Sequence, residues 1–265
     1  MKRTGCRKPA IAALVLMTTM VSGTAMAQAA ATGSSTTASQ KIDPMAIQAL
    51  RGMGAYLKTL QNFQIDSKAT IETNVEDSDI KITVGMNNVY QVERPNKFHV
   101  SLRSDRQMRD YYYDGKKFTV SIPRQHFFAV ADAPPTIAEV VDDMYNQYGI
   151  TLPLSDLFVW AYDGAPTDGL LSALRIGYAK IGNIDTDQFA YRGEQLDFQI
   201  WIARGPRPLP VKMVITSRDP ETRPSYSADL TWNTAAKFTP ATFAFKPDAK
   251  TSQIQMAKAS ASGSN

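Results

Sequence analysis

The residues able to perform acid–base, nucleophilic or metal chemistry are few and scattered. The chain has two histidines, His99 and His126, and neither lies in a His-x-His, His-x-x-x-His or Glu-containing spacing typical of a metal site. It has no Gly-x-Ser-x-Gly elbow for a serine nucleophile, and no glycine-rich loop ending in Lys-Ser or Lys-Thr to hold a phosphate. We therefore expect no metal, no cofactor and neither hydrolase nor nucleotide chemistry.

Paired carboxylates are the remaining candidates for catalysis. They occur at Asp142-Asp143 and at Glu76-Asp77 with Asp79. Two carboxylates hydrolyse a glycosidic bond when they face each other across a cleft, which neighbours in sequence do not do. The first pair lies on the polar side of an expected helix and the second in an expected turn, so both are expected to be solvated. No catalytic residue is predicted, and an enzyme would require a cleft that gathers carboxylates around a histidine.

The first 27 residues have the three parts of a secretory signal peptide. Four basic residues and no acid lie in the first nine positions, an apolar run covers residues 10–21, and Ala25-Met26-Ala27 is a small-x-small cleavage triplet. The apolar run is shorter than the roughly 20 residues of a membrane-spanning helix, so no transmembrane anchor is expected after cleavage. We expect export by the general secretory route, cleavage after Ala27 and a periplasmic mature protein.

Removal of the signal changes the chemistry available to the chain. It takes away four of the 29 basic residues and none of the 25 acidic ones, which leaves 25 of each. A neutral chain without a basic run does not favour binding to nucleic acid. The only cysteine, Cys6, is also removed, so no disulfide, thiol nucleophile or lipid-modified cysteine is expected in the mature protein.

The rest of the chain predicts one domain between two polar ends. Residues 28–41 and 255–265 are small, polar and aperiodic, and both are expected to be disordered. The domain over 42–254 begins with Asp43-Pro44, an N-cap followed by proline, and apolar residues then recur at helical spacing to about Gln61.

Strand periodicity follows this helix. Ile82, Val84 and Met86 alternate with polar residues, and Asp114-Gly115 is a hairpin signal between two aromatic runs. Helical spacing returns over residues 135–148 and 154–161, and from about Leu174 four more strand patterns are separated by short turns. Because short turns join antiparallel strands, the pattern predicts an α+β fold with about nine to eleven strands in a curved antiparallel sheet.

Trp201 adds information about how the sheet is covered. Leu196, Phe198, Ile200 and Ile202 fill one face of their strand, and Trp201 lies on the opposite face. Both faces of this strand are therefore apolar, which suits a sheet covered on one side by a helix or by a ligand.

Several local motifs resemble the periplasmic lipoprotein carrier (LolA/LolB-like) superfamily over essentially the whole domain. The matching segments are Leu60-Gln61-Asn62-Phe63, Arg94-Pro95-Asn96-Lys97-Phe98, Asp114-Gly115-Lys116, Tyr226-Ser227-Ala228-Asp229-Leu230 and Phe243-Ala244-Phe245-Lys246-Pro247. Trp201-Ile202 and Leu209-Pro210-Val211-Lys212 look more like an uncharacterised bacterial secreted family within that superfamily. The resemblance implies an incomplete β-barrel whose helices cover a hydrophobic cavity.

The resemblance also implies a role for one arginine. In the carriers the arginine of the Arg-Pro motif bonds to the helical lid, and this position corresponds to Arg94, which is otherwise an ordinary charge at the end of a strand. The long insert over residues 122–169 departs from the carrier pattern, so the lid is expected to differ.

These observations predict a non-catalytic periplasmic protein that binds an apolar ligand, a lipid acyl chain or a lipoprotein anchor. An alternative is a module that binds another envelope protein and whose core is filled by its own side chains, because aromatic and methionine residues on a strand are also ordinary core residues. The residues expected to line the hydrophobic cavity are Met86, Phe98, Val100, Phe118, Phe198, Ile200 and Met213.

Overall fold

The computed structural model describes residues 41–259, except 76–77, 79, 166 and 219–222. The expected signal peptide and its cleavage site after Ala27 lie outside the described residues, as do the acidic residues Glu76, Asp77 and Asp79. Within the described part of the chain, no helix is long and apolar enough to cross a membrane.

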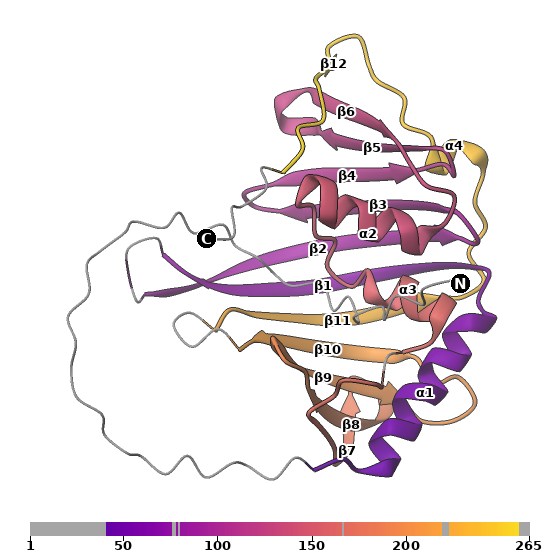
Figure 1. Ribbon diagram of the computed structural model, residues 1–265, viewed down its shortest axis with the longest axis vertical. Helices are drawn as coiled ribbons and strands as arrows, with labels where there is room; N and C mark the ends of the chain where they lie inside the picture. The colour runs from indigo at the N-terminus through magenta and orange to yellow at the C-terminus, as the bar shows by residue number, and fades with distance from the viewer. Residues whose placement is uncertain (1–40, 76–77, 79, 166, 219–222, 260–265) are drawn as a thin grey trace, which may run out of the picture.

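Twelve strands within the described residues form one sheet (Figure 1). The order across the sheet is β12-β6-β5-β4-β3-β2-β1-β11-β10-β9-β8-β7, and neighbours are antiparallel except for β12 beside β6. The strands are β1 (Asn62–Asn74), β2 (Lys81–Glu93), β3 (Lys97–Ser104), β4 (Met108–Tyr113), β5 (Lys117–Ile122), β6 (Phe127–Asp132), β7 (Ser172–Ile181), β8 (Ile184–Arg192), β9 (Leu196–Ala203), β10 (Pro210–Ser217), β11 (Ser225–Asn233) and the two-residue β12 (Ser252–Gln253).

Three helices begin and end near the positions that the sequence indicates: α1 (Pro44–Thr59), α2 (Ile137–Tyr148) and α3 (Asp156–Asp163). The short α4 (Pro240–Phe243) was not predicted. Asp43 caps α1, because its Oδ1 accepts a hydrogen bond from the Met45 amide at 2.8 Å. The predicted α+β class, with a curved antiparallel sheet, an N-terminal helix and a central helical insert, is confirmed.

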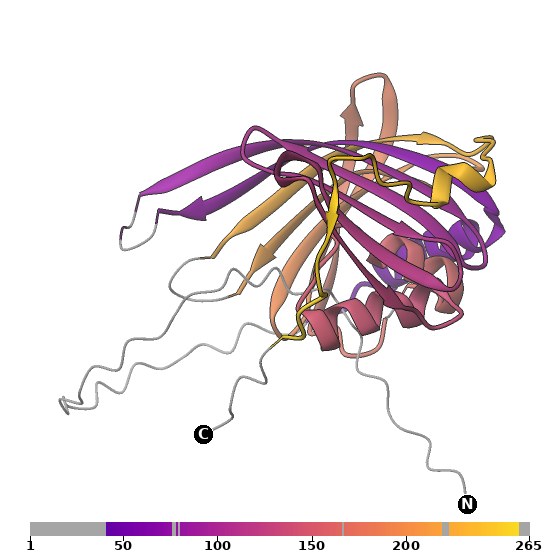
Figure 2. The same ribbon diagram turned by 90° about the horizontal axis from the view of Figure 1, so that it is seen from above.

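Helices α1, α2 and α3 all lie against the same face of the curved sheet, which we call the inner face (Figure 2). Phe158 of α3 packs between Phe63, Tyr90 and Phe98, with ring centroids 5.7–6.5 Å apart. Tyr191 of β8 donates a hydrogen bond to the Ala46 carbonyl of α1 at 2.9 Å. The helices therefore close one end of the inner face with a dense aromatic core.

The C-terminal segment lies on the opposite, outer face of β3–β6. Phe243 of α4 is only 1% exposed, and the Phe245 ring lies 5.5 Å from that of Tyr112 and 5.0 Å from that of Phe128. β12 then pairs with β6 at the edge of the sheet (Figure 2). Helices α2 and α3 of the central insert lie on the inner face, so this C-terminal segment covers the outer face of these strands.

Residues 255–259, part of the tail expected to be disordered, are among the described residues. Met256 is half-buried against the core, and the Ala259 amide donates to the Gln147 carbonyl of α2 at 2.8 Å. The C-terminal segment thus contacts both the edge of the sheet and the helical insert.

Candidate ligand-binding face

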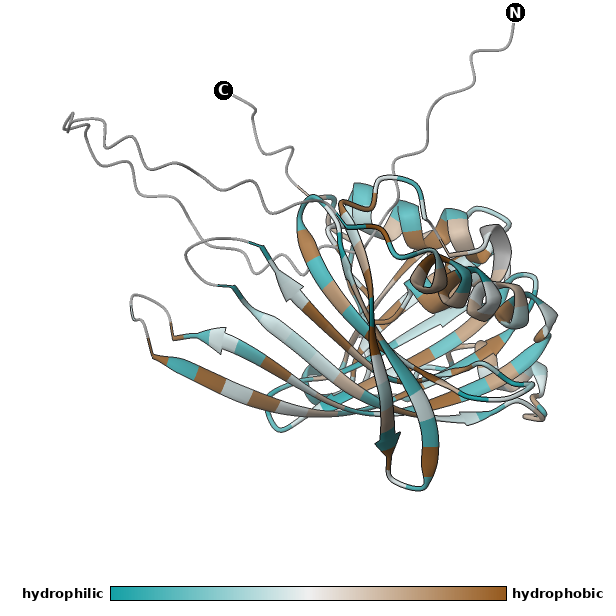
Figure 3. Cartoon of the chain, turned by 90° about the horizontal axis from the view of Figure 1, so that it is seen from below, coloured by the Kyte–Doolittle hydropathy of each residue, from teal (hydrophilic) through white to brown (hydrophobic). Residues whose placement is uncertain are grey.

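The inner face remains apolar beyond the end that the helices cover. Figure 3 shows apolar and polar residues alternating along the far parts of β1 and β2, with no described helix over them. Five side chains of this uncovered part are apolar and half-buried, and we call them the open end: Ile71, Ile82, Val84, Met86 and Ile215.

Strand pairing brings the open-end residues together from three strands. Ile71 of β1 lies opposite Val84 of β2, and Ile215 of β10 lies opposite Tyr226 of β11, which itself lies opposite Ile71. Residues opposite one another on neighbouring strands are close enough for their side chains to pack together. The open end is therefore a continuous apolar surface at the uncovered half of a curved sheet.

All seven residues predicted to line a cavity lie on the inner face, but most are covered by the protein itself. Phe98, Val100, Phe118, Phe198, Ile200 and Met213 are buried in the core, and only Met86 is partly exposed. Several of them are neighbours, since Ile200 pairs with Met213, and the rings of Phe98 and Phe118 lie 6.5 Å apart. Whether a ligand reaches these six buried residues stays a prediction.

Sequence reasoning missed most of the open end. The alternation of Ile82 and Val84 with polar residues showed that they share a face with Met86, but strand periodicity does not reveal how far a helix extends over that face. The exposed apolar residues Val75 and Ile80 at the turn between β1 and β2, 40% and 63% exposed, are a signal that this region is not covered.

Four buried polar residues adjoin the open end on the inner face: three lie on its side toward the aromatic core, and the fourth, Tyr226, lies between Ile71 and Ile215. Ser67 of β1 pairs with Asn88 of β2, Tyr90 lies two residues further along β2, and Tyr226 reaches them from β11. The Ser67 and tyrosine hydroxyls and both amide atoms of Asn88 make no hydrogen bond of good geometry with any of the described residues. We call these four residues the inner polar cluster.

The inner polar cluster is neutral at physiological pH. Burial raises the pKa of Tyr226 to about 12, and burial together with the neighbouring Tyr226 raises the pKa of Tyr90 well above its usual value. Burial raises both pKa values because a buried phenolate loses its hydration, and Tyr226 raises that of Tyr90 further through charge repulsion and a side-chain hydrogen bond. The cluster therefore offers uncharged donors and acceptors within an apolar face.

Arg94 contacts the end of α1. It follows β2, and its Nη1 donates to the Lys58 carbonyl at 2.7 Å and to the Leu60 carbonyl at 3.3 Å. These carbonyls lie at the C-terminus of the helix, where backbone acceptors lack intrahelical partners. The side chain thus joins the sheet to α1, and its action as a latch stays a prediction.

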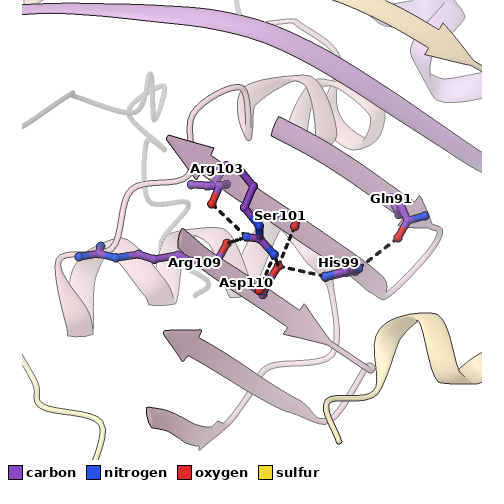
Figure 4. Close-up of polar contacts among 7 residues, drawn as sticks. Gln91, His99, Ser101, Arg103, Arg109 and Asp110 are labelled. Atoms are coloured by element: carbon purple, nitrogen blue, oxygen red, sulfur yellow. Dashed lines mark hydrogen bonds and ion pairs between the residues drawn. The ribbon is translucent and has the colours of Figure 1, made fainter. Parts of the chain in front are cut away.

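The outer face carries a separate polar cluster on β2, β3 and β4 (Figure 4). Asp110 accepts hydrogen bonds from Arg103 Nη2 at 2.6 and 2.8 Å and from Ser101 Oγ at 2.7 Å, while His99 Nε2 lies 3.6 Å away. His99 Nδ1 lies 3.1 Å from Gln91 Oε1. Burial alone would raise the pKa of Asp110, but hydrogen bonds from His99, Ser101 and Arg103 lower it.

This outer cluster brings a histidine to a carboxylate without forming a nucleophile and base. Ser101 donates to Asp110 rather than to His99, so the histidine is not placed to remove the serine proton. His126 is exposed at the end of a one-turn helix, apart from this cluster. Among the residues described, no group of three His, Cys, Asp or Glu side chains is arranged to hold a metal ion.

A shallow groove of about 730 Å³ is lined mainly by polar and charged residues of the outer face, together with Ala69, Gly85 and Met86. Lys68, Arg103 and Lys212 contribute positive charges to it, and Asp105 and Asp229 negative ones. Lys212 lies 3.5 Å from Asp229. The mixture of charges does not match the predicted hydrophobic cavity, so the open end is the better candidate site.

Trp201 is half-buried on this outer face. The Lys212 ammonium lies 5.7 Å from its ring centroid, so a lysine from the neighbouring strand, rather than a helix, lies against the indole. The helices cover the opposite face of the same strand, where Phe198 packs against Trp160 of α3 with centroids 6.4 Å apart.

The family model described as "Predicted periplasmic protein (DUF2092)" matches residues 46–257. Among curated proteins, none matches the sequence. The family match agrees with the sequence resemblance to an uncharacterised secreted family, so the predicted relationship is confirmed at the level of family and fold.

Solved structures with a similar fold come from several bacteria. An uncharacterised conserved protein from Thermus thermophilus has a TM-score of 0.46 and 9% identity, covering 80% of this chain and 99% of that one. The lipoprotein LppX of Mycobacterium tuberculosis has a TM-score of 0.42 and 14% identity, covering 74% and 98%. A LolA superfamily protein from Nitrosomonas europaea has a TM-score of 0.31 and 10% identity, covering 76% and 97%.

Proposed function

The chain belongs to the DUF2092 family of predicted periplasmic proteins, and from that premise we propose that it binds an apolar ligand on the inner face of its sheet without reacting with it. The ligand class is a lipid acyl chain or a lipoprotein anchor. The observation that carries this proposal is the open end, where the apolar inner face continues beyond the helices that cover its other half.

The open end has the character of a binding surface rather than of an ordinary exposed surface. Isolated apolar residues are common on protein surfaces, but a contiguous apolar patch marks an interaction site. Here Ile71, Met86 and Ile215 are packed against the core and still partly exposed. Each methylene that a ligand buries there contributes about 0.8 kcal/mol, so an acyl chain needs no charged contact for affinity.

The helices supply a way to enlarge this surface. Of the six buried residues that the sequence predicts as ligand contacts, Phe98 packs against Phe158 of α3 and Phe198 against Trp160 of the same helix. A shift of α3 away from Phe98 and Phe198 extends the apolar surface from the open end into the core. In this proposal, Arg94 limits that movement by holding the end of α1 to the sheet.

Binding is tested with residues 28–265, the mature chain expected after cleavage at Ala27, and with the apolar fluorescent probe diphenylhexatriene, which has no polar group. We expect Val84→Lys to weaken binding about tenfold or more, because it places a charge on the open end. Thr83→Lys is the matched control: Thr83 is the preceding residue of β2 and is exposed on the outer face. It should leave the affinity within about twofold.

Urea unfolding of both variants separates a loss of binding from a loss of folding. Native mass spectrometry of the purified protein should also detect lipid that copurifies with it. A wild-type protein that neither takes up the probe nor carries lipid would overturn the proposal.

The second candidate is a module that binds another envelope protein. The dense packing of the helix-covered core favours it, and so do three exposed apolar residues on the hairpin of β7 and β8: Ile176, Tyr178 and Ile184. In that case Ile176→Lys abolishes capture of a partner, whereas Val84→Lys has no effect on it.

A further inference from the structure

The inner polar cluster is an unusual feature of an otherwise apolar face. Ser67, Asn88, Tyr90 and Tyr226 are each at most 3% exposed. A buried polar group without a partner destabilises a protein by about 1–3 kcal/mol. The cluster contains five buried polar atoms that make no hydrogen bond of good geometry with the described residues. Packing of apolar side chains alone does not require such a cluster.

The position of the cluster relates it to the open end. Asn88 is two residues from Met86 on β2, and Ser67 pairs directly with Asn88. Because successive residues on one face of a strand are about 7 Å apart, the cluster begins one such step beyond the open end. An apolar chain that lies along Ile82, Val84 and Met86 thus leads to the polar atoms.

The chemistry of the cluster limits what it can bind. It presents hydroxyl groups, which donate and accept, and one carboxamide, which does both. None of these groups is charged at neutral pH, so the cluster lacks the cation that a buried carboxylate or phosphate requires. The ligand group that matches the cluster is therefore uncharged and both donates and accepts hydrogen bonds.

We propose that Ser67, Asn88, Tyr90 and Tyr226 bind the uncharged polar group, an amide or a hydroxyl, of a ligand whose apolar chain lies on the open end. This inference rests on the proposed function and specifies its ligand class as a neutral amphiphile. The apolar chain provides affinity, and the cluster selects among ligands by the polar group that they carry.

The test measures displacement of diphenylhexatriene from the mature chain by decanamide and by decanoate, which share a chain length. We expect wild-type protein to bind decanamide more tightly than decanoate. Asn88→Leu should weaken the binding of decanamide about tenfold, because it removes both the donor and the acceptor of the Asn88 carboxamide. Tyr226→Phe should weaken this binding by a smaller factor. Both variants should keep their affinity for diphenylhexatriene within about twofold, since that probe makes no hydrogen bonds.

Asn87→Leu is the matched control, because Asn87 is the neighbouring residue of β2 and lies exposed on the outer face. If decanamide binds Asn88→Leu as it binds wild type while diphenylhexatriene still binds, the polar-group site is overturned and the apolar site stands. If the wild-type protein binds neither diphenylhexatriene nor decanamide, both proposals fail.

Urea unfolding distinguishes a structural role for the cluster. Tyr226→Phe removes a single buried oxygen that makes no hydrogen bond of good geometry with the described residues, so we expect it to leave the stability unchanged or raised. A marked loss of stability, with decanamide affinity unchanged, would instead mean that the cluster is satisfied by permanently bound water, and would overturn the proposal.

Discussion

The pKa of Tyr226 is set by the burial of its side chain. It is 2% exposed, its ring lies on the inner face of β11, and burial raises its pKa to about 12. A tyrosine with that pKa is neutral at every pH at which the protein is expected to work. Its chemical contribution is therefore a neutral hydroxyl in an apolar environment.

The raised pKa of Tyr226 predicts a fall in stability at alkaline pH. Its pKa is higher in the folded chain than the value near 10 of an unfolded one, so its contribution is complete below pH 10 and is lost as the pH rises toward about 12. The slope from one such group is at most about 1.4 kcal/mol per pH unit. Urea unfolding at pH 8 to 11 should show a shallower decline for Tyr226→Phe than for wild type, and an identical decline would contradict this assignment.

Arg94 predicts a measurable link between the sheet and α1. Arg94→Leu removes the hydrogen bonds to the Lys58 and Leu60 carbonyls, so we expect the free energy of unfolding to fall by about 1–2 kcal/mol. Lys58→Leu is a suitable control, because its side chain is exposed and its carbonyl remains an acceptor.

A role as a latch requires a second, kinetic effect. Release of diphenylhexatriene, followed by stopped-flow fluorescence, should be faster from Arg94→Leu than from wild type. Unchanged release together with reduced stability would leave Arg94 as a structural cap of α1 only.

At the scale of elements, the C-terminal segment completes the half of the sheet farthest from α1. Phe243 is buried against the outer face, where the Lys97 ammonium lies 5.9 Å from its ring centroid, and Phe245 packs against Tyr112 and Phe128. Without this segment the aromatic residues of β4 and β6 on that face would be uncovered. The segment therefore acts as part of the core rather than as a tail.

Phe243 should accordingly contribute as a core residue does. We expect Phe243→Ala to lower the free energy of unfolding by about 3 kcal/mol, because it opens a cavity in a buried site. Phe127 in β6 is 41% exposed, and Phe127→Ala should cost less than about 1 kcal/mol. Equal effects in urea unfolding would show that the C-terminal segment packs less firmly than its burial indicates.

At the scale of the whole molecule, the sheet has two unlike halves. One is filled by α1, α3 and the aromatic cluster around Phe158, and the other extends beyond the helices with an apolar inner face. The covered half contributes most of the buried core, whereas no described helix lies over the open half. Local stability is therefore expected to be uneven along β1 and β2.

Hydrogen exchange can test this unevenness. Amides over residues 71–75 and 80–86 should exchange faster than those over residues 62–67 and 88–93, which lie nearer α3. Decanamide should slow exchange in the first group, because a bound ligand covers the open end and stabilises the folded chain by mass action. Uniform protection by the ligand, or none, would place its site elsewhere.

Local sequence signals were enough to predict the main helices and strands and the face on which each strand side chain lies. Asp43-Pro44 specified the start of α1, and two-residue alternation placed Phe98, Phe198 and Met213 on the inner face, because these signals depend only on neighbours in the chain. The Asp114-Gly115 hairpin was readable for the same reason: Gly115 has a φ of 97°, and Asp114 accepts bonds from two following amides.

Which inner-face residues are covered depends instead on how the helices pack on the folded sheet. Periodicity cannot give the extent of a helix over a sheet, so six of the predicted ligand contacts lie in the core, whereas Ile71 and Ile215 lie in the open end. Ser67, Asn88 and Tyr226 meet through the pairing of β2, β1 and β11, whose residues are far apart in sequence. Such convergence depends on long-range register, which no local pattern encodes.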